Sequence, residues 1–347
     1  MASQIMIQNA TNLSDYSNSD DGNSKIFTLG FDNLTIIKFL EAQNLVSRCV
    51  YIYSVFGLMG LIMGIVILIR NMRNYKQKVN FERFDIILLS LTVADLSLIL
   101  FSLTDVVRPE EVNTTALGCA VLSFFFNIFY FHTGYTHIVI FFLVYDHLEM
   151  VRRALKKTYI SILAVMGISI TFSILITSLT GAGHHPNMSV NCHVDPLEAP
   201  AEYSIVKFVF GFLIPTLTIL GLLLHFLINS KCLQKAQDNQ DQSECFHPRR
   251  VFLLLVMVTF VCRLIYNVLL LHQFQEEAWH PISHLKFKPL VTIRELVMFS
   301  GSCLCLMFIA IFHELRHQAM INAYRNHNVM SPEIEITGNH DESASLN

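Results

Sequence analysis

The stretch 86-IILLSLTVADLSLILFSLT-104 is mostly apolar, and Asp95 is its only charged residue. A helix needs about 20 such residues to cross the roughly 30 Å of hydrocarbon in a bilayer. A run of this length and composition is therefore typical of a membrane-spanning helix, and it sets the scale on which the rest of the chain is divided.

Similar apolar runs divide the whole chain, and besides Asp95 only Arg263 interrupts them with a charge. The chain is 53% hydrophobic and 15% charged, which is more apolar than a soluble fold of this size would hide. The sequence predicts an all-α membrane protein with a seven-transmembrane helix bundle. The predicted spans are 49–69, 86–104, 119–145, 159–180, 208–229, 251–272 and 296–312.

Glycosylation sequons and basic residues predict the orientation of these spans. Lys and Arg gather in the first, third and fifth gaps between spans, which is typical of the cytoplasmic side. The sequons fall instead in the N-terminal segment and in the second and fourth gaps. We therefore expect the N-terminus outside and the C-terminus in the cytoplasm. The predicted glycosylation sites are Asn9, Asn12, Asn33, Asn113 and Asn187.

Composition divides the chain into four segments. The ends are rich in Asn, Ser, Asp and Glu and poor in aromatic residues, which is typical of segments without fixed structure. After the last span, apolar and polar residues alternate as in an amphipathic helix that lies at the membrane interface. The predicted segments are an extracellular glycosylated tail at 1–45, a transmembrane domain at 46–312, an interfacial helix at 313–327 and a cytoplasmic tail at 328–347.

The cysteines separate by compartment once this topology is assumed. Cys119, at the outer start of the third span, and Cys192, in the second outer loop, are the predicted disulfide pair. Such a bond would hold the loop over the bundle. Cys262, Cys303 and Cys305 lie in spans, where packing is the expected role.

Three short motifs resemble those of the rhodopsin-like (class A) G protein-coupled receptors. The stretch 89-LSLTVADL-96 is similar to the second-span signature of that family, and 212-FLIP-215 is similar to its fifth-span motif. Cys119 and Cys192 match its disulfide. The resemblance implies a receptor in the plasma membrane that transmits the binding of an extracellular ligand to a cytoplasmic heterotrimeric G protein.

Other family motifs are altered in this chain, which resembles an atypical, orphan-type member. His147 stands where the family's acidic box has its arginine, Arg263 and Ile265 replace the toggle tryptophan and the kink proline, and the region of Cys305 replaces the seventh-span motif. An alternative function is therefore a seven-span decoy or heteromerisation partner that does not couple. The positions that the resemblance assigns to switching and coupling are Asp95, Asp146, His147, Pro215 and Arg263.

The resemblance also assigns a ligand pocket. Phe129 stands where amine receptors carry an aspartate, so a biogenic amine is not expected. Lys207 and Arg263 against Glu295 favour an anionic small molecule, with a lipid or a peptide as alternatives. In a competing interpretation, Lys207 extends to the outer membrane interface. The predicted pocket residues are Phe129, Tyr130, Thr133, Lys207, Arg263, Tyr266, Asn267 and Glu295.

Arg263 raises an energetic question of its own. A guanidinium at the middle of a bilayer is costly unless it faces the bundle interior and finds a partner. Asp95 and Glu295 are the two candidate anions. The pair would form either the floor of the pocket or a purely structural contact.

One motif indicates a different class of protein. The stretch 313-HELRH-317 has the H-E-x-x-H spacing of zinc proteases, in which two histidines bind the metal and the glutamate acts as a base. An intramembrane protease is thus a remote alternative, against the simpler interpretation of a helix end with favourable basic residues. We expect no enzymatic activity, no cofactor, no bound metal and no nucleic-acid partner; the bilayer is the expected environment.

Overall fold

The protein is described here by a computed structural model. It describes residues 33–76, 83–107, 113–144, 158–180, 189–191, 195, 201–234, 246–279 and 284–329. The chain divides into one unit at Met1–Glu41 and a second at Ala42–Asn347. The helix bundle belongs to the second unit, to which the following description applies.

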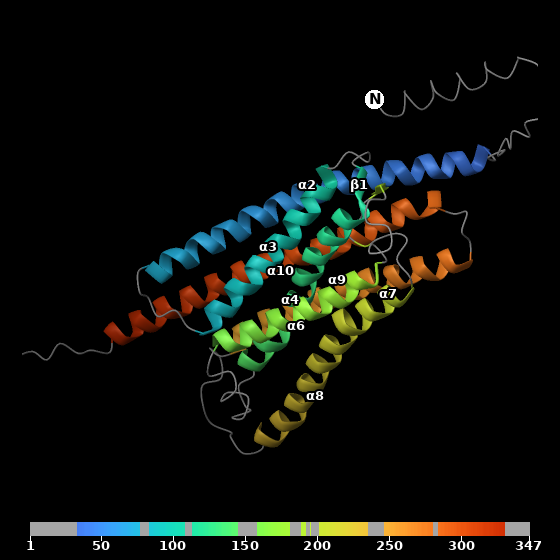
Figure 1. Cartoon of the computed structure of the whole chain (residues 1–347). Coiled ribbons are helices and arrows are strands. Elements are labelled where there is room, and N and C mark those ends of the chain that lie inside the picture. The colour runs from blue at the N-terminus through green and yellow to red at the C-terminus, as the bar shows by residue number, and fades with distance from the viewer. Residues whose placement is uncertain are drawn as a thin grey trace, which may run out of the picture. The chain divides into compact units, whose positions relative to one another are not determined.

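Long helices account for nearly all of the described residues (Figure 1). They are α2 (Asn33–Lys76), α3 (Arg83–Val107), α4 (Ala116–Val144), α6 (Thr158–Ser178), α7 (Ala201–Phe208), α8 (Ile214–Gln234), α9 (Phe246–Trp279) and α10 (His284–Val329). A π-helical turn, η1 (Val209–Leu213), joins α7 to α8. The helical fold class is therefore as predicted.

Seven spans are long and apolar enough to cross a membrane, and each overlaps a predicted one. The sixth, Val251–His272, has the predicted bounds. The fifth begins at Ala201 rather than at residue 208, because Lys207 lies buried inside the helix instead of ending it. The chain is a multi-pass membrane protein whose spans are Tyr51–Arg73, Phe84–Phe101, Ala116–Leu143, Thr158–Ser178, Ala201–His225, Val251–His272 and Ile293–Leu315.

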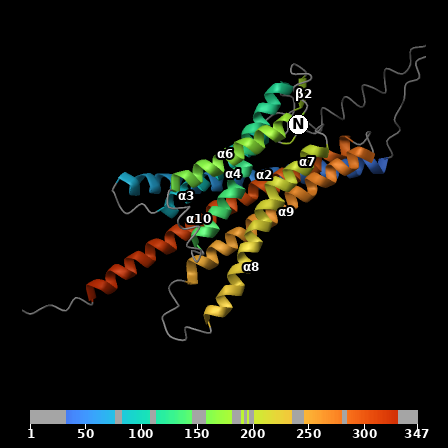
Figure 2. The ribbon, with the colours of Figure 1, turned by 60° about the horizontal axis from the view of Figure 1, so that its bottom comes forward.

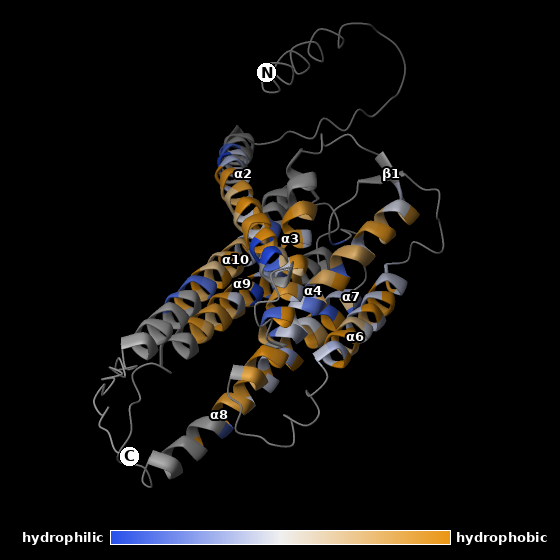
Figure 3. Cartoon of the chain, turned by 90° about the vertical axis from the view of Figure 1, so that its left-hand side faces the viewer, coloured by the Kyte–Doolittle hydropathy of each residue, from blue (hydrophilic) through white to orange (hydrophobic). Residues whose placement is uncertain are grey.

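The outer faces of these helices are apolar, as Figure 3 shows by colour. Leu163 is 69% exposed, Leu220 58% and Ile62 53%. Soluble monomers rarely expose apolar surface on this scale. The polar side chains are instead buried between helices, which is the arrangement that a hydrocarbon surrounding requires.

Helix α4 is the most buried span and packs against both α3 and α6. Figures 1 and 2 both show α7 running beside α9, and these two helices are in contact. One buried cluster includes Phe126, Tyr130 and Tyr266 and lies toward the end of the bundle that carries the strands. A second includes Leu91 and Leu306.

Two glycines let α2 approach its neighbours closely. A Cβ on Gly60 would lie 2.8 Å from the Sγ atom of Cys303 in α10, and a Cβ on Gly64 would collide with Leu96 in α3. Small residues four apart on a helix are a common device for packing in membranes, where apolar burial alone gives little driving force.

A small antiparallel sheet, not predicted from the sequence, joins two connecting segments. Strand β1 (Asn113–Thr115) pairs with β2 (Ser189–Asn191), with Asn113 opposite Asn191. The sheet ties the α3–α4 connection to the α6–α7 connection. It therefore holds the second of these connections near the start of α4.

Two predicted segment boundaries differ from the structure. The predicted unstructured tail ends too late, because α2 begins at Asn33 and residues 33–45 are helical. The predicted interfacial helix at 313–327 is helical but is not separate: α10 continues through it without a break to Val329. Neither glycine nor proline interrupts the sequence between His313 and Val329, so nothing local forces the helix to end.

Candidate functional site

Asp195 lies at the centre of a buried ionic cluster, although it comes from the connection between α6 and α7. Its side chain is 1% exposed. The Oδ1 atom accepts hydrogen bonds from the Nζ atom of Lys207 and, at 2.7 Å, from the hydroxyl of Tyr203. The Oδ2 atom accepts a hydrogen bond at 2.5 Å from the hydroxyl of Tyr266 and lies 3.3 Å from the Nη2 atom of Arg294. We call these five residues the Asp195 cluster.

The cluster joins three helices. Tyr203 and Lys207 are one turn apart on α7, Tyr266 is on α9 and Arg294 on α10. Burial alone would raise the pKa of the Asp195 carboxyl, but the charges of Lys207 and Arg294, with hydrogen bonds from Lys207 and Tyr266, hold that pKa well below its usual range. Asp195 is therefore a carboxylate at physiological pH.

Lys207 does not extend to the membrane interface, so the competing interpretation is wrong. Its side chain is 0% exposed. The Nζ atom lies 4.9 Å from the ring centroid of Phe126, 5.0 Å from that of Tyr130 and 5.4 Å from that of Tyr266. Aromatic faces attract a desolvated cation, so these rings and the carboxylate of Asp195 stabilise the ammonium together.

Arg263 lies deeper in the bundle and is held by neutral groups. Its Nη1 atom donates to the carbonyl of Gly211 at 3.2 Å. Its Nη2 atom donates to the carbonyl of Tyr130 at 2.8 Å and to the hydroxyl of Thr133. The guanidinium carbon lies 4.6 Å from the centroid of the Tyr130 ring. We call Arg263 with these partners the Arg263 node.

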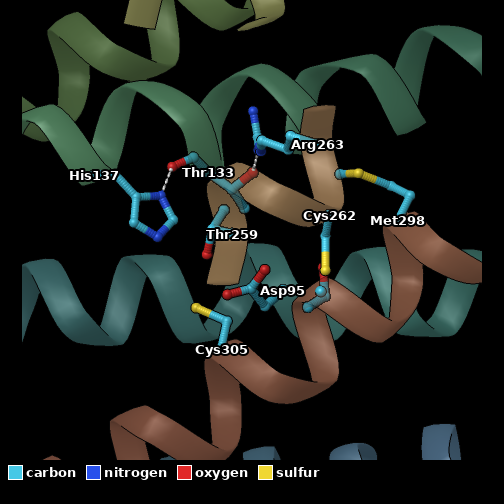
Figure 4. Close-up of a pocket in the computed structure, with 10 residues that line it drawn as sticks. Asp95, Thr133, His137, Thr259, Cys262, Arg263, Met298 and Cys305 are labelled. Carbon is cyan, nitrogen blue, oxygen red and sulfur yellow. Dashed lines mark hydrogen bonds between the residues drawn. The ribbon is translucent and has the colours of Figure 1, made fainter. Parts of the chain in front are cut away.

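The predicted ion pair between Arg263 and Asp95 or Glu295 is wrong. Within the described part of the chain the guanidinium of Arg263 forms no ion pair. Arg263 and Asp95 instead line one small cavity, with room for about one water molecule, as Figure 4 shows. Glu295 is buried on α10, next to Arg294 of the Asp195 cluster.

The carbonyl that Arg263 contacts is available because of a local sequence feature. In an α-helix the carbonyl of Gly211 would bond to the N–H of residue 215, but Pro215 has none. In η1 the N–H of Ile214 bonds to the carbonyl of Val209, so the carbonyl of Phe210 also loses its usual partner. The hydroxyl of Tyr135 donates to Phe210 at 3.0 Å, and Arg263 donates to Gly211.

Glycines make room for the node. A Cβ on Gly134 would lie 2.6 Å from the Nη1 atom of Arg263, and a Cβ on Gly211 would collide with the ring of Tyr130. Asn267 completes the surroundings, because its Nδ2 atom donates to the hydroxyl of Tyr130 at 2.9 Å and to the carbonyl of Arg263 at 2.7 Å.

The structure thus brings together most of the pocket residues that the sequence predicts. Tyr130 and Tyr266 have their ring centroids 5.7 Å apart and connect the two groups of contacts. Phe129 points elsewhere: its ring packs against Phe101 of α3, at 6.0 Å between centroids. The connected residues are Tyr130, Thr133, Lys207, Arg263, Tyr266 and Asn267.

Sequence reasoning missed Asp195, Tyr203 and Arg294. Arg294 was excluded because the seventh span was predicted to begin at residue 296, three residues after its observed start at Ile293. A signal for Asp195 was present: it follows the predicted loop cysteine, Cys192, by three residues. Lys207 and Arg294 together need more negative charge than Glu295 alone supplies.

Several predicted sites lie partly or wholly outside the described residues. Cys119 is disulfide-bonded. Its predicted partner, Cys192, directly follows β2 but is itself not described, so this pairing stays a prediction. Also outside the described residues are Asn9, Asn12, Asp146, His147 and Asn187, and nothing is described of the side chains of Asn33 and Asn113.

Nothing is described of the side chain of His317, so the H-E-x-x-H stretch is tested only through the other side chains that the structure describes. No group of three potential metal ligands was found there. Glu314, the base in the protease hypothesis, forms an exposed ion pair with Arg70 of α2 at 3.2 Å.

Comparison with known proteins identifies the family. Residues 62–304 match the family described as 7 transmembrane receptor (rhodopsin family), a stretch that begins in α2 and ends in α10 and covers more than half of the chain. No curated protein is significantly similar to the chain in sequence. The matched family consists of receptors that bind ligands and signal through G proteins, and it is not enzymatic. The chain belongs to the rhodopsin family of seven-transmembrane receptors.

Proposed function

We propose that the protein is a plasma-membrane receptor that binds an extracellular ligand at the strand-bearing end of the bundle and passes the signal to a cytoplasmic G protein. The N-terminus lies outside and the C-terminus inside. The observation that carries this proposal is a continuous series of buried polar contacts from the Asp195 cluster to the Arg263 node.

Tyr130 is the shared element of that series. Its ring lies below the ammonium of Lys207 and beside the guanidinium of Arg263, and its hydroxyl bonds to Asn267. Arg263 in turn contacts the π-helical turn η1. A ligand that displaces the rings or charges of the Asp195 cluster would therefore change the groups that hold α4, α8 and α9 together. Signalling requires a ligand with different affinities for two such arrangements.

The chemistry of the site favours some ligands over others. Among the described residues the anions near the Asp195 cluster are Asp195 itself and Glu295, and Asp195 already forms ion pairs with two cations. Phe129 occupies the position at which amine receptors carry an aspartate, so an amine is not the proposed ligand. An anionic small molecule, lipid or peptide fits the donors better.

The test is to express the receptor in cells and to measure G protein dissociation and second messengers across the main G protein classes. A His147→Arg variant, which restores the family's arginine, is measured beside the wild type at equal surface expression. Basal or ligand-dependent dissociation in the wild type would support coupling through histidine. Silence of both proteins with every ligand tested would contradict the proposal.

The second candidate function is a seven-span partner or decoy that does not couple. The specific observation in its favour is that histidine stands at position 147, where the family has arginine, a permanent cation. Silence of the wild type together with activity of His147→Arg would support this alternative and locate the loss of coupling at that residue.

A further inference from the structure

The carboxylate of Asp195 has the environment of a bound ligand. The residue belongs to the connection between α6 and α7, whereas every described side chain that contacts its oxygens belongs to a helix. Each oxygen receives one tyrosine hydroxyl and one cation: Tyr203 and Lys207 at Oδ1, and Tyr266 and Arg294 at Oδ2. The helices thus present one hydroxyl donor and one cation to each oxygen of one carboxylate.

These side chains form a binding site for a particular chemical group. Ammonium and guanidinium groups can only donate, and both tyrosine hydroxyls donate here. Their partner must therefore carry negative charge and two acceptor oxygens at the spacing of a carboxylate. Charge-assisted hydrogen bonds of this kind are the strongest that side chains form, and a buried position increases their strength further.

Contacts other than those with Asp195 also fix the donors. The ammonium of Lys207 lies within 5.6 Å of the ring centroid of Tyr203 and closer to those of Phe126, Tyr130 and Tyr266. The guanidinium carbon of Arg294 lies 5.8 Å from the ring centroid of Tyr266. A preorganised site of this kind keeps its geometry when one carboxylate replaces another. Glu295 interacts electrostatically with both cations but supplies only one negative charge, so a second carboxylate in this site is needed to balance the buried pair.

We propose that Tyr203, Lys207, Tyr266 and Arg294 form a carboxylate-binding site and that Asp195 is its built-in occupant. A ligand that carries a carboxylate binds there by displacing the side chain of Asp195. For its consequence in signalling this inference rests on the proposed receptor function, but the binding itself does not. In that setting a ligand must bind the four site residues more favourably than the side chain of Asp195 does.

The experiment removes the carboxylate of Asp195 by mutation and supplies acetate in solution as its replacement. Wild type and Asp195→Ala are purified in detergent, and thermal unfolding is followed in rising concentrations of sodium acetate or of sodium chloride at equal ionic strength. Asp195→Ala should unfold at a lower temperature than the wild type. Acetate should restore much of the difference, whereas chloride should not, and the wild type should respond equally to both salts.

Two controls define the site. Glu202→Ala removes an exposed carboxylate from the same helix as Lys207 and should show neither the loss nor the acetate effect. Adding Arg294→Gln to Asp195→Ala removes one of the cations and should reduce the acetate effect at least several-fold. If Asp195→Ala does not yield folded protein, Asp195→Ser, whose side chain is also too short to fill the site, enters the same comparison.

Some outcomes would overturn the proposal. A folded Asp195→Ala protein that acetate does not stabilise more than chloride would show that Asp195 is an internal ion-pair partner only. An acetate effect that persists unchanged in the Arg294→Gln background would place the binding elsewhere. Neither measurement involves a G protein, so a receptor that fails to couple leaves the result intact, and a coupling receptor without acetate binding overturns this inference alone.

Discussion

At the scale of single residues, Arg263 shows how a buried charge is accommodated without a direct ion pair. Its hydrogen bonds go to two carbonyls and a hydroxyl, and the face of Tyr130 supplies further negative potential. Hydrogen bonds that involve a charged group contribute about 1.5–3 kcal/mol each, which offsets part of the cost of burial. The arrangement works only if nothing separates the guanidinium from the backbone of α4.

Gly134 provides that access, and its substitution tests the arrangement. A Cβ at Gly134 would lie 2.6 Å from the Nη1 atom of Arg263, so Gly134→Ala should destabilise the protein by about 1–3 kcal/mol, as overpacking does. Gly167→Ala on α6 is the matched control, because nothing lies within 4 Å of a Cβ there. Its stability should be unchanged or slightly higher, since alanine favours helix. Equal melting temperatures for the two variants would contradict this account.

Asp195 leads to a prediction about pH. Its pKa in the folded protein lies below the unfolded value of about 3.9, so its stabilisation is fully present above that pH and is lost as the pH falls toward the folded value. Removing one partner of a buried pair costs about 3–5 kcal/mol. The difference in melting temperature between wild type and Asp195→Asn should therefore be the same at pH 7 and pH 5 and narrow below about pH 4.

The control for the pH series is Glu202→Gln, which removes an exposed charge and should match the wild type at neutral and mildly acidic pH. A gap between wild type and Asp195→Asn that closes between pH 7 and pH 5 would mean that the cluster titrates in the physiological range. In that case Asp195 would act as an acid sensor rather than as a permanent carboxylate.

At the scale of elements, Pro215 and the π-turn η1 together make two backbone carbonyls available for contacts with other helices. Pro215 removes a donor, the π-turn shifts the remaining hydrogen bonds by one residue, and two carbonyls of one turn become acceptors for other helices. The fifth span is thereby joined to α4 through Tyr135 and to α9 through Arg263. The turn is thus a packing device and not a defect in the helix.

A double-mutant cycle tests this role of η1. Tyr135→Phe removes the hydroxyl that donates to Phe210 and should cost about 1 kcal/mol in the wild type. Pro215→Ala restores the N–H of residue 215 and permits a regular α-helix, in which Phe210 regains its backbone donor. In that background Tyr135→Phe should cost almost nothing. Tyr159→Phe, at a residue that is 69% exposed, is the control. Equal costs in both backgrounds would contradict the proposed coupling.

At the scale of the whole molecule, the sequence predicts the spans well and the site only in part. The sixth span has the predicted bounds because its apolar run ends sharply at both sides. The fifth and seventh were predicted to begin at residues 208 and 296 rather than at Ala201 and Ile293, which left Lys207 and Arg294 outside them, whereas both are buried against Asp195. The spacing of Asp195 from Cys192 indicates its loop but not its partners, since these depend on how a connecting segment folds over distant helices.

The partners of Arg263 were mispredicted for a related reason. Charge alone suggested an acid, and Asp95 and Glu295 were the acids at hand. One actual acceptor is the carbonyl of Gly211, which becomes available only through Pro215 and η1, and the others are the carbonyl of Tyr130 and the hydroxyl of Thr133 on α4. Pro215 itself was identified from the sequence as a switch position, but its effect on hydrogen bonding depends on the three-dimensional course of the fifth span.

The orientation of the molecule in the membrane gives the last prediction. Every sequon lies in a segment that the proposed topology exposes outside, so deglycosylation should increase the mobility of the expressed protein, and replacing Asn9, Asn12, Asn33, Asn113 and Asn187 together by Gln should abolish that shift. A sequon introduced between α8 and α9, on the proposed cytoplasmic side, should remain unmodified, whereas one introduced between α9 and α10 should be glycosylated. The pair is matched because both insertions lie between spans and differ only in side. Modification between α8 and α9 would reverse the orientation, and with it the assignment of the Asp195 cluster to extracellular ligands.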